Sequence, residues 1–149
     1  MKTSIISILF LALIAFACNN QPDVDFEGDG QVEATVAGNL FSAKLSVAFF
    51  MDSTLQLGRL DKDNAQLQFN QIYTTGTYDL GLQNGGYIDN IMLMLEDGTH
   101  LSMGDGTYTI SKLTNRNTEG TFSGTAYALT DIFFQNPIKV EAGTFEANF

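Results

Sequence analysis

The sequence predicts a single all-β domain, an antiparallel β-sandwich or small β-barrel of roughly eight to ten strands, that follows an N-terminal signal peptide. Three observations predict this fold class. Apolar and polar residues alternate with a period of two along most of the chain after residue 30. No segment there has the 3.6-residue apolar period of an amphipathic helix. Clusters of Gly, Asn and Asp divide the alternating segments into short lengths.

Residues 1–17 are predicted to be a secretory signal peptide. Lys2 provides a basic start, and residues 5–17 form an uncharged apolar run of 13 residues. As a helix this run would rise about 20 Å, which is short of the roughly 30 Å hydrocarbon core of a bilayer. It therefore fits a cleaved signal better than a permanent membrane span.

Residues 15–18, "AFAC", resemble the lipobox of bacterial lipoproteins, although Ala15 replaces the usual Leu. The resemblance implies cleavage between Ala17 and Cys18, transfer of a diacylglycerol to the Cys18 sulfur, and acylation of the freed amine, for example with palmitate. Two or more acyl chains anchor a protein stably to a membrane. The alternatives are a secretory signal with an unused thiol, or a catalytic thiol, for which the only histidine, His100, is distant in the sequence.

Residues 18–30 are predicted to be the lipidated cysteine and a flexible acidic tether. Acidic residues at alternate positions resemble the start of an EF-hand calcium loop: Asp23, Asp25, Glu27 and Asp29. The twelfth position of such a loop needs a bidentate Glu, and this chain has Ala34 there. Pro22, the glycines and the charge describe a solvated linker instead, and no metal site is predicted.

The residues after the cysteine also indicate a location. Asn19 follows Cys18, whereas lipoproteins retained in the inner membrane of enteric bacteria carry Asp there, so we expect the outer membrane. The acidic residues from Asp23 onward resemble the surface-export signals of Bacteroidota lipoproteins. This favours the cell-surface face over the periplasmic face without deciding between them.

The mature domain, residues 31–149, is predicted to begin with a hairpin that turns at Gly38–Asn39. Its inward face is expected to consist of Val32, Ala34, Val36, Phe41, Ala43, Leu45, Val47 and Phe49. Further short strands are expected around Leu55, Leu67 and Tyr78. Turns are expected at residues 84–86, 97–98 and 104–106 because each contains glycine next to Asn or Asp.

Two features are expected in the second half of the domain. The segment from Ile91 to Leu95 is apolar on both faces, which predicts a central strand covered on both sides. The apolar parity of the last strand switches between Val140 and Phe145, which predicts a β-bulge near Gly143.

Four segments carry a resemblance to a family of small Bacteroidota outer-membrane lipoproteins of unknown function: "VEATVAGNLFSAKL", "TGTYDLG", "TEGTFSGTAYA" and "VEAGTFEANF". They resemble the opening hairpin, the Gly-Thr-Tyr strand and the closing Gly-Thr-Phe pair of that family. The resemblance covers most of the mature chain. It implies an all-β fold and a cell-envelope location, and it provides no activity and no site residues.

Composition excludes several classes of function. The formal net charge is −10, so the field of the protein would repel a phosphate backbone, and nucleic acid is not an expected partner. A single cysteine rules out an internal disulfide and a Cys-rich zinc site. No cofactor is predicted.

The sequence predicts no catalytic residues and no enzyme activity. His100 and Ser102 are spaced so that they share a strand face, but this spacing is common by chance. Five acids could in principle form a glycosidase pair, and turn or strand-surface positions explain them better: Asp79, Asp89, Glu96, Asp97 and Asp105. Loops containing Asp61, Asp63, Asp97 and Asp105 offer an incomplete calcium ligand set.

The sequence therefore predicts a lipid-anchored, non-catalytic binding or interaction module for protein or glycan, displayed at the cell envelope. Phe133 and Phe134, adjacent on an expected strand, would place one apolar ring in solvent or at an interface. The alternative is a lipocalin-like carrier with an apolar cavity lined by Met92 and Met94, which a filled interior would exclude. A hydrolase and an integral outer-membrane β-barrel with a closing strand at residues 143–149 are further alternatives.

Overall fold

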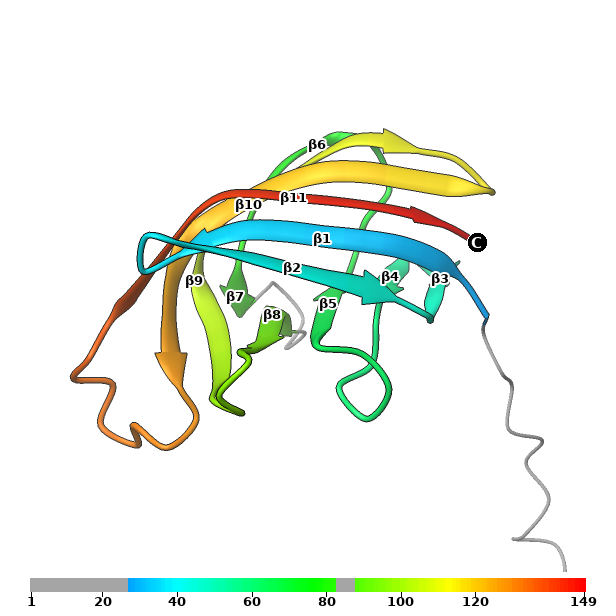
Figure 1. The fold of residues 1–149 in the computed structure, drawn as a ribbon. Helices are drawn as coiled ribbons and strands as arrows, with labels where there is room; N and C mark the ends of the chain where they lie inside the picture. Colours follow the sequence, from blue (N-terminus) through cyan, green and yellow to red (C-terminus); the bar gives the residue numbers. More distant parts are fainter. Residues whose placement is uncertain (1–26, 83–87) are drawn as a thin grey trace, which may run out of the picture.

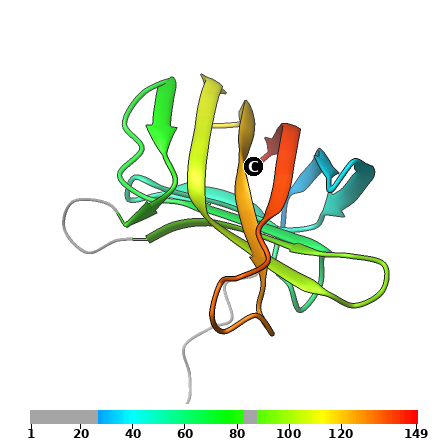
Figure 2. The same cartoon turned by 90° about the vertical axis from the view of Figure 1, so that its left-hand side faces the viewer.

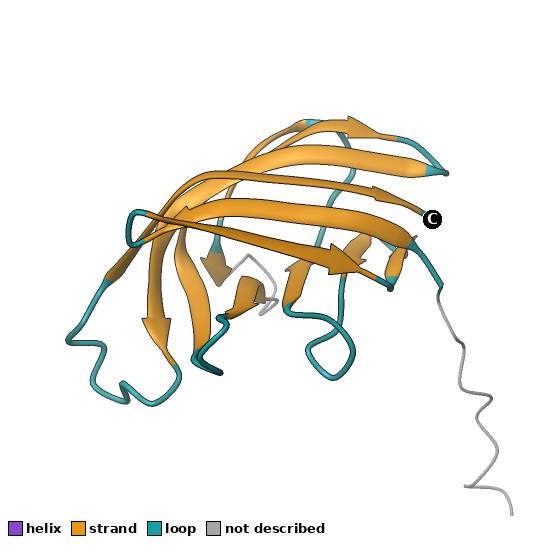
Figure 3. Ribbon diagram, viewed as in Figure 1, coloured by secondary structure: helices purple, strands orange, loops and turns teal. Residues whose placement is uncertain are grey.

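The computed structural model describes residues 27–82 and 88–149, and all regular secondary structure in these ranges is β-strand (Figures 1 and 3). The all-β prediction is confirmed. Ala17, Cys18 and most of the tether lie outside the described residues, as does the turn expected at residues 84–86.

Eleven strands form one antiparallel sheet across the described ranges. Four of them are only two to four residues long, which is why the count exceeds the predicted eight to ten. The strands are β1 (Asp29–Val36), β2 (Asn39–Leu45), β3 (Ala48–Met51), β4 (Thr54–Leu57), β5 (Ala65–Phe69), β6 (Gly76–Asp79), β7 (Gly81–Leu82), β8 (Ile88–Met94), β9 (His100–Leu113), β10 (Asn117–Ala128) and β11 (Ile138–Asn148).

The sheet has the order β2-β1-β11-β10-β9-β8-β5-β4-β3, with β6 paired to β9 and β7 paired to β8. Strand β9 is long enough to pair with β8 through residues 100–103 and with β6 through residues 107–110. The sheet curls into a nearly closed barrel (Figures 1 and 2). Its two end strands, β2 and β3, are consecutive in the chain and bring the two edges of the sheet together.

The predicted opening hairpin is formed by β1 and β2. Ala37 and Gly38 both have positive φ, 50° and 84°, as a two-residue hairpin turn requires. The turn lies one residue before the predicted Gly38–Asn39 because Ala37 adopts the left-handed conformation. The inward alternation holds through Val47, which is buried, and ends in β3, where Ala48 is buried and Phe49, expected inside, is only half-buried.

The barrel closes at Ser46 and Val47, the only residues between β2 and β3. The Asp63 carboxylate, 6% exposed, accepts hydrogen bonds from the Ser46 N–H (3.0 Å), the Ser46 hydroxyl (2.8 Å) and the Arg59 N–H (3.0 Å). Gly58 donates its N–H to the Val47 carbonyl at 2.7 Å. These bonds join the β2–β3 connection to the segment that follows β4 and satisfy backbone groups of both.

A column of aromatic rings occupies the barrel interior. Tyr78 and Tyr108 are stacked with ring centroids 5.3 Å apart, and Tyr108 stacks on Phe69 at 4.0 Å. Phe145 continues the column at 5.6 Å from Phe69. The two longer spacings fall in the usual range of aromatic pairs, and Phe69, Tyr108 and Phe145 are buried.

The bulge predicted near Gly143 is confirmed, since Glu33 pairs with Thr144 while Thr35 pairs with Glu141. The turn predicted at residues 104–106 is wrong, because β9 runs through this segment and the register against β10 shifts there. Gly106 approaches the Ser123 carbonyl too closely for a Cβ. Position 106 is therefore glycine because two strands pack closely there, and not because the chain turns.

Two expected strand positions also differ. Strand β8 is central, between β5 and β9, but only one of its faces is fully buried, with Ile91 and Leu93 inside and Met92 half-buried outside. Phe133 and Phe134 lie in the β10–β11 loop instead of on a strand, and both are exposed.

Candidate functional site

A groove opens in the barrel wall between the β1–β2 hairpin and the β8–β9 turn. Its volume is about 350 Å³, within the usual range for small ligand pockets. It is lined by Val36, Ala37, Asn39, Leu40, Phe41, Ser42, Leu95, Glu96, Asp97 and Ile138. Three distant parts of the sequence therefore build one site.

At the C-terminal end of β2, the side chain of Leu45 and the carbonyl of Ala65 both lie close to Gly58, so the walls meet there. Toward its N-terminal end, β2 faces Leu95 and the following turn.

Strand β2 pairs with β1 along one edge, and no described strand pairs with its other edge over residues 39–42. An unpaired edge presents backbone N–H and C=O groups to any extended chain that reaches it.

The floor of the groove is apolar and firmly packed. Phe41 is buried, and Leu95 and Ile138 pack against the core while remaining partly exposed. Leu40 at the rim is 81% exposed, the largest exposure among the large hydrophobic side chains in the described ranges. Apolar surface at this edge is therefore free to contact another molecule.

The wall opposite β2 is acidic. Glu96 and Asp97 are in the β8–β9 turn, where Leu95 N–H donates to the Thr99 carbonyl at 2.9 Å. The backbone N–H of Thr99 donates to the Asp97 carboxylate at 2.8 Å and holds its pKa below the ordinary value. Asp97 therefore remains negatively charged at neutral pH, and the predicted Asp97–Gly98 turn is confirmed.

Of the acid and histidine candidates from the sequence, Glu96 and Asp97 line this groove, and the others do not converge on it. Asp79 is at the end of β6, Asp89 is on β8, and Asp105 is in the bulge of β9. His100 and Ser102 occupy the same strand two positions apart, so their Cβ atoms start about 7 Å from each other. Within the described ranges, no three His, Cys, Asp or Glu side chains could hold a metal ion.

Asp89 is a buried residue that the sequence interpretation placed wrongly at a turn or on a polar strand face. Its carboxylate, 1% exposed, accepts hydrogen bonds from the Asn70 N–H (2.6 Å), the Asn70 side-chain amide (3.1 Å) and the Tyr108 hydroxyl (2.7 Å). The period-two pattern could have predicted this burial, since Asp89 is on the same face of the strand as the buried Ile91 and Leu93. This cluster lies under the aromatic column and is structural.

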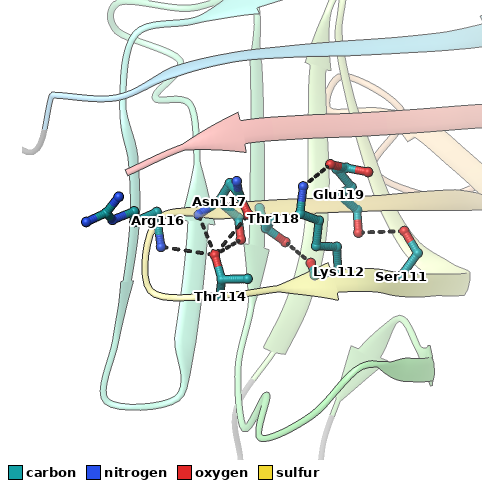
Figure 4. Close-up of polar contacts among 7 residues, drawn as sticks. All are labelled: Ser111, Lys112, Thr114, Arg116, Asn117, Thr118 and Glu119. Carbon is teal, nitrogen blue, oxygen red and sulfur yellow. Dashed lines mark hydrogen bonds and ion pairs between the residues drawn. The ribbon is translucent and has the colours of Figure 1, made fainter.

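The outer face at the β9–β10 hairpin is polar, and its groups bond mainly to one another (Figure 4). Lys112 and Glu119 form an ion pair at 2.6 Å. The Thr114 hydroxyl accepts the N–H groups of Arg116 (3.1 Å) and Asn117 (3.0 Å).

The expected Met92 and Met94 cavity lining is not formed by these side chains. Both lie on the outer face of β8, and Met103, which is fully buried, packs into the core. No helix in the described ranges is long and apolar enough to cross a membrane.

Comparisons of this chain with protein-family models, curated proteins and solved structures gave no match.

Proposed function

We propose that this protein is a lipid-anchored, non-catalytic binding module of the bacterial cell envelope that captures an extended segment of a partner protein in the groove beside β2. The observation that carries the proposal is the coincidence of an unpaired strand edge with an apolar groove along it.

The groove suits β-strand addition. In that mode, main-chain hydrogen bonds to an exposed sheet edge provide affinity, and a pocket for alternate side chains provides specificity. Residues 39–42 of β2 supply the edge, and Phe41, Leu95 and Ile138 supply the pocket. A four-residue edge pairs with a short segment, which fits a regulatory or scaffolding contact better than a permanent complex.

The wall residues define the chemistry of the partner. An apolar side chain would occupy the floor between Phe41 and Leu95, and a basic residue would face Glu96 and Asp97. The negative net charge of the protein adds a longer-range attraction for a basic segment and should make the association rate fall as salt is added.

The anchoring part of the proposal is supported by the lipobox resemblance at residues 15–18 and by the acidic, Pro-containing linker behind it. Cys18 is the acceptor for the acyl chains in this proposal. The outer membrane is the location that Asn19 favours.

A carrier of an apolar small molecule is the second candidate, because a 350 Å³ apolar groove could also hold a compact ligand. Stacked rings occupy the barrel interior, so such a ligand would bind in the groove in the barrel wall and not in an interior cavity of the lipocalin type. An extended peptide would contact the β2 backbone, whereas a small molecule would need only the apolar floor.

Selection from a displayed peptide library against the full chain tests the proposal. We expect enriched peptides with an apolar residue next to a basic one. L40D should weaken their binding by roughly tenfold or more, because burying a Leu side chain contributes about 1.5–3 kcal/mol. Y73D is the matched control, since Tyr73 is 75% exposed and does not line the groove.

N-methylated versions of a selected peptide separate the two candidates. Methylation of the amides that face β2 should abolish binding if the peptide adds a strand. Binding that survives every single N-methylation, or that L40D leaves unchanged, would contradict strand addition in this groove.

A further inference from the structure

We propose that the β10–β11 loop is a second, separate contact site, which inserts its apolar tip into the zwitterionic lipid surface to which the chain is anchored. The proposal depends on the anchoring part of the proposed function and not on the groove beside β2.

The tip exposes three consecutive large apolar side chains. Ile132, Phe133 and Phe134 are 71%, 73% and 68% exposed, and Leu129 in the same loop is 53% exposed. The loop projects from the barrel wall in both views (Figures 1 and 2, orange). A convex apolar projection fits insertion into a fluid surface, whereas a protein partner would need a matching cavity.

The tip is held in place by its own hydrogen bonds. The Asp131 carboxylate accepts the Asn136 N–H at 2.7 Å and the Asn136 side-chain amide at 3.3 Å. The Phe134 N–H donates to the Asp131 carbonyl at 3.0 Å, and the Phe134 ring packs edge-on against Tyr127. These bonds hold the apolar side chains in their exposed positions. They also direct the Asp131 carboxylate toward Asn136 of the same loop.

The apolar surface extends beyond the tip. A recess of about 580 Å³ beside the loop is lined mainly by apolar side chains, including those of Tyr127, Leu129, Ile132 and Phe134. It could accept part of a lipid molecule once the tip is inserted.

The length of the linker keeps the loop within reach of a membrane. Nine residues separate Cys18 from Gly28, so the fully extended linker spans about 30 Å. A domain of this size is about 35 Å across. An anchored domain would therefore remain within about one domain diameter of the bilayer. The loop tip could then meet the lipid surface without the domain first having to diffuse to it.

The charge of the loop and of the whole protein indicates which lipid headgroups the tip would contact. No Lys or Arg occurs between Arg116 and Lys139, so the loop has no cation with which to bind anionic headgroups. The net charge of −10 would be repelled by an anionic surface. Zwitterionic phosphatidylethanolamine and phosphatidylcholine are therefore the expected lipids.

The absence of tryptophan from the chain provides a direct test. F133W places a single fluorescent reporter at the tip, and Y73W places one at a position of similar exposure in the β5–β6 connection. Each processed chain, residues 18–149 with its acylated cysteine, is reconstituted into phosphatidylcholine and phosphatidylethanolamine vesicles. We expect both to float with the vesicles, and only F133W to show a blue-shifted emission that brominated acyl chains quench.

The outcomes are distinguishable. If F133W floats but emits like Y73W, the loop proposal is overturned and the anchor stands. If neither chain floats, the anchor fails and the loop proposal fails with it. A shift that requires anionic lipid, or that appears only when envelope proteins are added, would also overturn insertion into a zwitterionic surface, the latter in favour of a protein partner.

Discussion

Asp89 is a carboxylate that the protein keeps inside its hydrophobic core. Three hydrogen bonds satisfy it, and the Tyr108 hydroxyl that donates one of them belongs to a ring stacked between Phe69 and Tyr78. A buried charge is tolerated only when it is satisfied in this way. The cluster therefore fixes the rotamer of Tyr108 and, through it, the order of the aromatic column.

Y108F should destabilise the protein by about 1–3 kcal/mol, because it leaves a buried carboxylate short of one donor while keeping the ring in place. Y73F is the control and should change the free energy of unfolding by less than about 0.5 kcal/mol, since Tyr73 is exposed. Denaturant unfolding of the three proteins measures the difference. Equal stability of Y108F and wild type would show that Asp89 does not depend on this hydroxyl.

The environment of Tyr108 predicts that the folded protein loses stability at alkaline pH. Burial, followed by the hydrogen bond and charge of Asp89, raises the pKa of Tyr108 above its ordinary value of 10.0. The folded protein then holds the phenol proton more tightly than the unfolded chain, so this stabilisation is complete below pH 10.0 and is lost as pH rises further. Unfolding by urea at a series of alkaline pH values should show a steeper fall for wild type than for Y108F, and parallel curves would contradict the assignment.

At the scale of elements, period-two alternation predicted most strands because one face of each strand packs into the core. It failed where long-range packing decides the local conformation. The glycines at 104–106 form a bulge because Gly106 lies against Gly124 of the neighbouring strand, a pairing that local sequence does not reveal. The groove was not predicted, since Leu40 and Leu95 come together only when the barrel closes.

The closure between β2 and β3 can be tested with two acids in one loop. D63A should destabilise the protein by about 1–3 kcal/mol or more, because it removes the acceptor of the Ser46 and Arg59 N–H groups. D61A removes an exposed ion pair with Arg59 and should cost less than about 1 kcal/mol. Thermal or denaturant unfolding compares the pair. A D63A protein as stable as D61A would mean that the carboxylate does not hold the two sheet edges together.

At the scale of the whole molecule, the proposals divide the protein into an anchor, a groove and an apolar loop. In the proposed function, Cys18, which lies outside the described residues, is the acceptor of the acyl chains. C18S should abolish incorporation of labelled palmitate and block cleavage after Ala17, so that the precursor migrates more slowly on a gel than the processed wild-type protein. A wild-type cysteine without a lipid adduct by mass spectrometry would contradict the anchor.

The residues that line the groove and the exposed residues of the loop tip do not overlap, so partner binding and lipid contact should be separable. L40D should impair only peptide binding, and F133W should report only on lipid. Loss of both properties in L40D would indicate a damaged fold, which the stability measurements above would detect.

Amide hydrogen exchange of the full chain, with and without a selected peptide, tests the central claim most directly. Strand addition predicts new protection of the backbone amides of residues 39–42 that point away from β1, with little change in the β10–β11 loop or the aromatic core. Protection confined to other segments, or bound peptide that leaves the β2 amides exchanging as before, would contradict the account.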